Sequence, residues 1–143
     1  IGITYINGTL DELKEQADKL ALSGAVLLNG IENDDIAAVV QGAGALMLVS
    51  TFEGFGLPLV EAMAAGVPTV TSNVSCLPEV AGGAALLADP YSEKSIAEAM
   101  ERIITDEVLR EELIEKGKER AKAFTWKNTA DTFVKEIGKR LSK

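Results

Sequence analysis

Two glutamates flank a glycine-containing loop in the middle of the chain, and they are the strongest chemical signal in the sequence. Glu53 precedes Gly54 and Gly56, and Glu61 follows Pro58. Glycine lets backbone N–H groups approach a ligand that a side chain would keep away. If a helix begins at Pro58, its positive N-terminal end adds to these donors, so the loop can hold a phosphate group. The two carboxylates can accept hydrogen bonds from neighbouring sugar hydroxyls.

The same residues also have purely structural interpretations, which the loop alone leaves open. Gly-x-Gly before a helix is often only a tight turn. Glu61, expected in the first turn of that helix, is a favourable charge at a helix start. Glu53 can be a solvated loop acid. Spacing therefore does not decide between a ligand site and a structural turn.

The loop lies between short apolar strands and helices that alternate along the chain. Strands are expected at 1–6, 25–28, 45–49, 67–71 and 84–87; helices are expected from a capping box at 9–12 to residue 20, and at 34–41, 58–65, 92–104, 106–124 and 126–141. This alternation predicts right-handed βαβ units on a parallel sheet. Ligands of such sheets bind beyond the carboxyl ends of the strands, which is where residues 50–56 fall.

Composition narrows the possible functions. The 143 residues suit one domain with one core. The chain has no histidine and only one cysteine, Cys76, which excludes imidazole catalysis, an internal disulfide framework and most zinc sites. The net charge is −8, and residues 21–93 contain no lysine or arginine, so nucleic-acid binding is not expected. No apolar run approaches the ~18 residues that cross a membrane. The first residues lack the pattern of a signal peptide, which a processed chain would have lost, and we expect a cytoplasmic protein.

A long stretch of the sequence resembles one enzyme family. Residues 50–72, STFEGFGLPLVEAMAAGVPTVTS, resemble the E-x7-E signature of glycosyltransferase family 4, which contains retaining enzymes with two Rossmann-like domains (the GT-B fold). The resemblance continues through residues 73–90, LREEL at 109–113 and FTWKNT at 124–129, and includes VLLNG at 26–30. Residues 25–135 thus match the carboxy-terminal, donor-binding domain of the family, and residues 1–22 match it loosely.

The resemblance implies a role for each matching residue. Glu53 is the implied catalytic residue, in contact with the transferred sugar, and Glu61 accepts hydrogen bonds from the ribose. The donor sugar and diphosphate are bound by Gly54, Phe55, Gly56 and Leu57, and the nucleobase by Ile31. The implied donor is a UDP-, GDP- or ADP-linked sugar. The family is metal-independent, and no metal or cofactor is expected.

The chain also departs from the family pattern. Members carry an amino-terminal acceptor domain. The first βα unit of their donor domain contains a Gly-Arg pair and a lysine that bind the diphosphate. Neither feature precedes Ala25. Without that first βα unit, the resemblance implies a flavodoxin-like sheet of about five strands in the order 2-1-3-4-5, with carboxy-terminal helices. We therefore expect a donor-binding half that is inactive without the missing domain, and weak nucleotide binding.

The last helix and the alternative functions complete the sequence predictions. Ala130, Phe133, Val134 and Ile137 form an apolar stripe at helical spacing. We predict that it folds back on its own sheet, with a homodimer contact as the rival. The alternative to a donor-binding half is a non-enzymatic or engineered flavodoxin-like domain that retains the signature. A receiver-type signalling domain is disfavoured because its acidic strand-end residues and lysine are missing.

Overall fold

The computed structural model describes residues 2–3, 10–22 and 33–141. Four short strands and seven helices lie in this part of the chain. In chain order they are β1 (Gly2–Ile3), α1 (Leu10–Lys19), α2 (Asn33–Gln41), β2 (Ala45–Leu48), α3 (Leu57–Ala64), β3 (Thr69–Ser72), α4 (Leu77–Ala81), β4 (Leu86–Ala88), α5 (Glu93–Thr105), α6 (Glu107–Ala121) and α7 (Trp126–Leu141). The alternation of strands and helices expected from the sequence is confirmed.

The strands form one parallel sheet in the order β1-β2-β3-β4. This order is the predicted one without its edge strand, because the strand expected at 25–28 lies outside the described residues. The prediction of about five strands is therefore met only in part, by four strands in the described ranges. β3 is central, and all four of its residues are buried. Parallel sheets covered on both faces have such strands.

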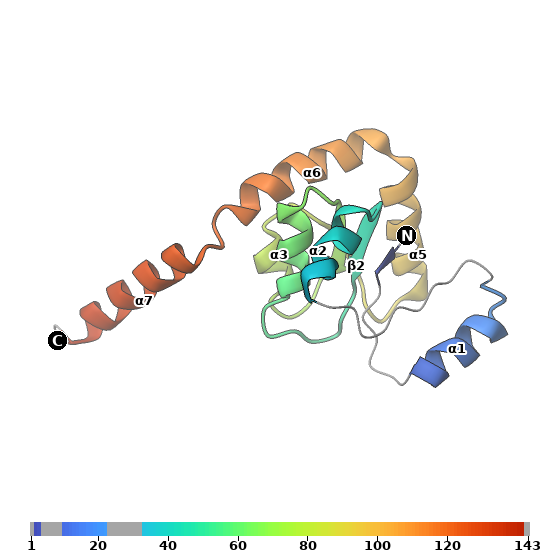
Figure 1. Ribbon diagram of the computed structural model, residues 1–143, viewed down its shortest axis with the longest axis horizontal. Coiled ribbons are helices and arrows are strands. Elements are labelled where there is room, and N and C mark those ends of the chain that lie inside the picture. Colours follow the sequence, from blue (N-terminus) through green and yellow to red (C-terminus); the bar gives the residue numbers. More distant parts are fainter. Residues whose placement is uncertain (1, 4–9, 23–32, 142–143) are drawn as a thin grey trace.

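Helices cover the two faces of the sheet (Figure 1). On one face, Leu48 packs with Leu59 and Met63 of α3 and with Leu77 of α4. On the other face, Val70 packs with buried residues of α5 and α6. α6 contacts both α3 and α5, so it bridges the two layers. In Figure 1, α6 runs across the top of the molecule.

Local sequence signals account for the helix ends. The side chains of Ser92 and Asp106 accept hydrogen bonds from backbone N–H groups in the first turns of α5 and α6, and Thr125 does the same for Asn128 in α7. After α3, Gly66 adopts a left-handed backbone, with φ of +74°. α3 begins at Leu57, one residue earlier than predicted, so Glu61 is the fifth helical residue and not part of the first turn.

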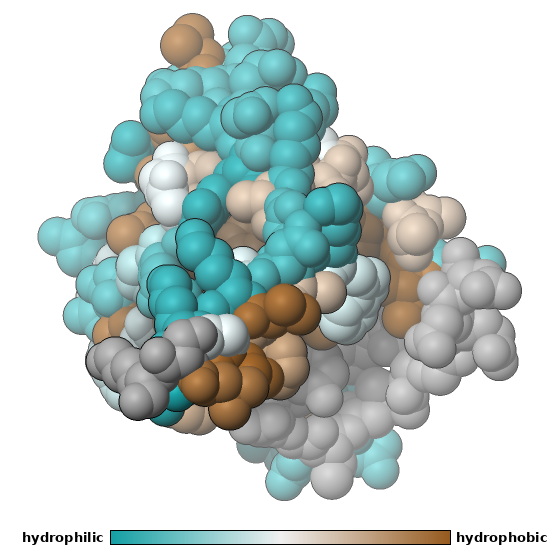
Figure 2. All heavy atoms as spheres, turned by 90° about the vertical axis from the view of Figure 1, so that its left-hand side faces the viewer, coloured by the Kyte–Doolittle hydropathy of each residue, from teal (hydrophilic) through white to brown (hydrophobic). Residues whose placement is uncertain are grey.

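The predicted fold-back of the last helix is wrong. α7 has its predicted bounds, but none of its residues is buried, and Trp126 is 91% exposed. Figure 1 shows the helix projecting away from the sheet beyond α6. In Figure 2 it points toward the viewer, and apolar side chains form a brown patch at the front. The stripe is present, but no described part of the chain covers it.

Candidate functional site

The 50–56 loop lies at the carboxyl edge of the sheet, between β2 and α3. Buried hydroxyls of the neighbouring strand β3 hold the end of β2. Thr71 Oγ1 donates a hydrogen bond to the Leu48 carbonyl oxygen at 2.9 Å, and Ser72 Oγ donates to the Ser50 carbonyl oxygen at 2.6 Å. The loop therefore leaves the sheet from a fixed point.

Gly56 sets the path of the loop into α3. Its φ of +88° is left-handed, and an added Cβ would lie 2.7 Å from Leu77 Cδ2. No other residue type fits here without strain and displacement of the core. Gly54 differs from Gly56, because nothing lies within 4 Å of a Cβ added there. The space above Gly54 is open to a ligand.

The loop presents free backbone donors. Within the described part of the chain, no acceptor pairs with the N–H groups of Gly54, Phe55 and Gly56. α3 begins directly after them, and no side chain caps its first turn. In this turn Pro58 has no N–H group and the Leu59 N–H donates to the Gly56 carbonyl oxygen, so what α3 itself adds is the positive end of its dipole. The structure thus brings together the donors and the helix end that a phosphate group requires.

Glu53 is held from two sides. Its backbone N–H donates to Ser75 Oγ at 3.2 Å, and its carbonyl oxygen accepts from Ser75 Oγ at 2.9 Å and from Cys76 Sγ at 3.1 Å. Ser50 Oγ donates to Glu53 Oε1 at 2.9 Å. Ser75 itself is a non-glycine residue with a positive φ of 60°. The carboxylate is therefore anchored at the edge of the sheet and not free in solvent.

Glu61 is exposed on α3, one helical turn beyond Leu57. Residues four apart share a helix face, so Glu61 and Leu57 present one surface, and Leu57 is 61% exposed. One turn rises about 5.4 Å along the axis. Glu61 therefore lies within reach of a ligand that binds at the start of the helix.

An aromatic contact ties the loop to the end of α6. Phe55 meets Phe124 edge to face, with ring centroids 5.5 Å apart and an angle of 81° between the planes. The Arg120 guanidinium lies 4.8 Å from the Phe124 centroid and donates hydrogen bonds to the Val80 and Glu79 carbonyl oxygens. Residues 21–93 contain no lysine or arginine, but α6 supplies Arg120, whose guanidinium packs on the ring that contacts Phe55.

Sequence reasoning missed Ser75, Arg120 and Phe124 as parts of the site. Ser75 and Phe124 stand in the stretches that carry the family resemblance, which was their only signal. Ile31, predicted at the nucleobase, lies outside the described residues. Among the described residues, no helix is long and apolar enough to cross a membrane, and no group of three metal-ligating side chains comes together.

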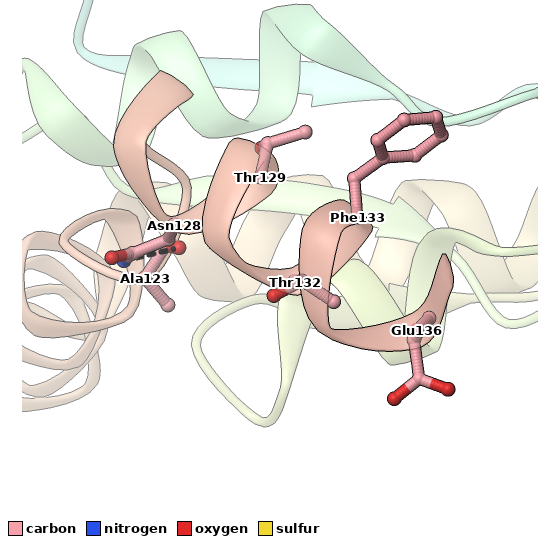
Figure 3. Close-up of a pocket in the computed structure, with 6 residues that line it drawn as sticks. All are labelled: Ala123, Asn128, Thr129, Thr132, Phe133 and Glu136. Carbon is pink, nitrogen blue, oxygen red and sulfur yellow. Dashed lines mark hydrogen bonds between the residues drawn. The ribbon is translucent and has the colours of Figure 1, made fainter. Parts of the chain in front are cut away.

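Two open hollows lie elsewhere on the surface. One is lined by Ala123 and by Asn128, Thr129, Thr132, Phe133 and Glu136 of α7 (Figure 3). All six come from one continuous segment, so no other element supplies an opposing wall. The second lies between α4 and the end of α6. Neither is lined by Glu53, Glu61 or the loop residues whose N–H groups are unpaired.

Comparison with known proteins identifies the family. The family described as Glycosyl transferases group 1 matches residues 2–120. O-antigen chain mannosyltransferase B of Escherichia coli is 40% identical over 101 residues, which cover 71% of this chain and 26% of the mannosyltransferase.

Solved structures share the fold. Sucrose-phosphate synthase from Thermosynechococcus elongatus aligns with a TM-score of 0.81 and 25% identity, over 92% of this chain and 34% of the synthase. Anabaena HepE, in complex with UDP and glucose, aligns with a TM-score of 0.76 and 24% identity, over 93% of this chain and 36% of HepE. The chain thus spans about a quarter to a third of these proteins. It belongs to the group 1 glycosyl transferases.

Proposed function

We propose that the 50–56 loop and α3 form the donor site of a retaining, family 4 glycosyltransferase, and that residues 1–143 are its nucleotide-sugar-binding half. One observation carries the proposal. Unpaired N–H groups of Gly54, Phe55 and Gly56 stand at the uncapped start of α3, beside an anchored carboxylate. Donors of this kind suit the diphosphate of a nucleotide sugar.

The two glutamates have separate roles in this proposal. Glu53 contacts the donor sugar near the reacting carbon, since its carboxylate is fixed beside the phosphate donors by Ser50. Glu61 accepts hydrogen bonds from the ribose hydroxyls, one turn further along α3. Leu57 is exposed at the start of α3. Ile31 remains the proposed contact of the nucleobase.

The relatives suggest which donor to test first. A 40% identical relative is a mannosyltransferase, and a neighbour in fold was solved with UDP and glucose. Mannose is thus the first sugar to examine, and the nucleotide remains one of UDP, GDP and ADP. The cytoplasmic location also remains a prediction.

We propose that α7 docks on another part of the assembly. Its stripe is exposed, and burial of each large apolar side chain stabilises a contact by about 1.5–3 kcal/mol. An acceptor-binding domain, as the family resemblance implies, is our first choice of partner. A second copy of the chain is the alternative. Catalysis in this proposal requires the facing domain, because the reacting sugar lies at an exposed edge.

Calorimetric titration with UDP, GDP and ADP tests the proposed function. We expect one of them to bind a polypeptide of residues 1–143 with a dissociation constant on the order of millimolar, about −4 kcal/mol. Glu61→Ala should weaken this binding several-fold. Glu111→Ala, which removes an exposed carboxylate on α6, is the matched control and should leave it unchanged.

Three results would count against parts of this proposal. Binding that Glu61→Ala leaves unchanged would refute the ribose assignment. Sub-micromolar binding would refute the idea that backbone N–H groups alone hold the diphosphate. No binding by any of the three nucleotides would favour the alternative, a non-enzymatic domain that keeps the signature.

A further inference from the structure

We infer that Ser75 is a positioning residue for Glu53, and that its hydroxyl fixes the backbone on both sides of the Cα from which the sugar-contacting carboxylate extends. The inference rests on the proposed role of Glu53 in donor binding. It concerns a contact between residues 22 positions apart, which the fold creates by placing the turn before α4 against the 50–56 loop.

The Ser75 hydroxyl binds both backbone polar groups of Glu53. Ser75 Oγ accepts a hydrogen bond from the Glu53 N–H at 3.2 Å and donates one to the Glu53 carbonyl oxygen at 2.9 Å. A hydroxyl has one proton and two lone pairs, so it can make both bonds at once. Rotation of the Glu53 backbone would break at least one of them.

The backbone of Ser75 supports a specific use of this hydroxyl. Its φ of 60° lies in the left-handed region, which residues with a side chain seldom adopt. Glycine would occupy this position without strain, and what serine adds is the hydroxyl. Strained residues of this kind cluster at functional sites, where surrounding contacts hold them.

The anchored peptide leaves part of the carboxylate available. Ser50 Oγ donates to Glu53 Oε1 at 2.9 Å. No described residue donates a hydrogen bond to Glu53 Oε2. Ser75 fixes the backbone of Glu53, and Ser50 fixes its Oε1. Glu53 Oε2 therefore has a defined direction in which it can accept a hydrogen bond from a sugar hydroxyl.

Ser75→Gly tests the inference, because it removes the hydroxyl and relieves the backbone strain together. The dissociation constants of UDP, GDP and ADP, and of UDP-glucose, GDP-mannose and ADP-glucose, are measured by NMR titration. We expect Ser75→Gly to weaken binding of the nucleotide sugar about fivefold, the effect of a lost net hydrogen bond. Binding of the free nucleotide should stay within twofold, because Cys76 Sγ still donates to the Glu53 carbonyl oxygen and holds the peptide that carries the Gly54 N–H. A general disturbance of the loop would weaken both.

A double-mutant cycle separates positioning from other effects. In a Glu53→Gln background, Ser75→Gly should cause no further loss of sugar binding. Asn73→Gly is the matched control: it lies between the same two elements, its side chain makes no hydrogen bond to a described residue, and it should change neither constant.

The possible failures are distinguishable. If Glu53→Gln does not alter nucleotide-sugar binding, or no nucleotide binds, the proposed function fails and the inference with it. If Glu53→Gln weakens sugar binding and Ser75→Gly does not, only the inference is overturned. Equal loss for nucleotide and nucleotide sugar in Ser75→Gly also overturns it, because the serine would then merely support the loop.

Discussion

α3 and α7 are both apolar on one side, but only α3 buries its apolar residues. α3 buries Leu59, Val60, Ala62 and Met63 against the sheet, α4 and α6. α7 has twice as many residues, 16 against 8, and buries none. Helical periodicity shows that a face is apolar, but it does not show what covers that face.

This difference suits the two helices to different roles, ligand binding for α3 and docking for α7. The start of α3 is fixed by the core below it, which suits a loop that must hold ligand donors in one geometry. α7 follows the turn after α6 and buries none of its residues, so it can present a surface to another partner. The predictions below test this division, from the largest expected effect to the smallest.

Matched leucine truncations should show the greatest contrast. Leu59 is fully buried on α3, whereas Leu141 on α7 is 83% exposed. We expect Leu59→Ala to lower the free energy of unfolding by about 2–5 kcal/mol, and Leu141→Ala by less than about 0.5 kcal/mol. Urea denaturation followed by circular dichroism measures both. Equal losses would show that α7 is packed in solution.

Glycine substitutions in the loop should give the next largest difference. Gly56→Ala places a methyl group 2.7 Å from Leu77 Cδ2 at a left-handed φ, whereas Gly54→Ala meets open space. We expect Gly56→Ala to destabilise the fold by about 2–4 kcal/mol, and Gly54→Ala by less than about 1 kcal/mol. Gly54→Ala should instead weaken nucleotide binding. A stable Gly56→Ala variant would contradict the described entry into α3.

These contrasts also show which features of the fold and of the site could be predicted from the sequence. The alternation of strands and helices and the bounds of α7 depend on local patterns, and the structure confirms them. The contact of Ser75 with Glu53 and that of Phe124 with Phe55 join distant segments. Such contacts depend on how the helices pack, which no local pattern encodes. The exposure of the stripe was mispredicted for the same reason.

Removal of two equivalent helix caps should distinguish a global effect from a local one. Ser92 caps α5, which packs on the sheet, and Thr125 caps the unpacked α7. Ser92→Ala should cost about 1 kcal/mol of global stability. Thr125→Ala should reduce only the helical signal of α7, because an isolated helix of this length is marginal in water. If Thr125→Ala lowered global stability, α7 would have to pack against the core.

Deletion of residues 126–143 should have the smallest effect on stability. Because α7 buries no side chain, we expect the free energy of unfolding to change by less than about 0.5 kcal/mol. Light scattering before and after deletion shows whether the helix joins two copies. A lower melting temperature at every protein concentration would restore the fold-back hypothesis, and a concentration-dependent one would favour the homodimer.

Amide chemical shifts during nucleotide titration test the central claim most directly. An NMR spectrum reports on both regions in one sample and detects millimolar binding. We predict that the amide signals of Gly54, Phe55, Gly56 and Leu57 shift together and saturate with UDP, GDP or ADP, while those of residues 126–141 remain in place. Saturating shifts confined to α7 or the hollow beside it, with residues 54–57 unchanged, would contradict a donor site at the start of α3.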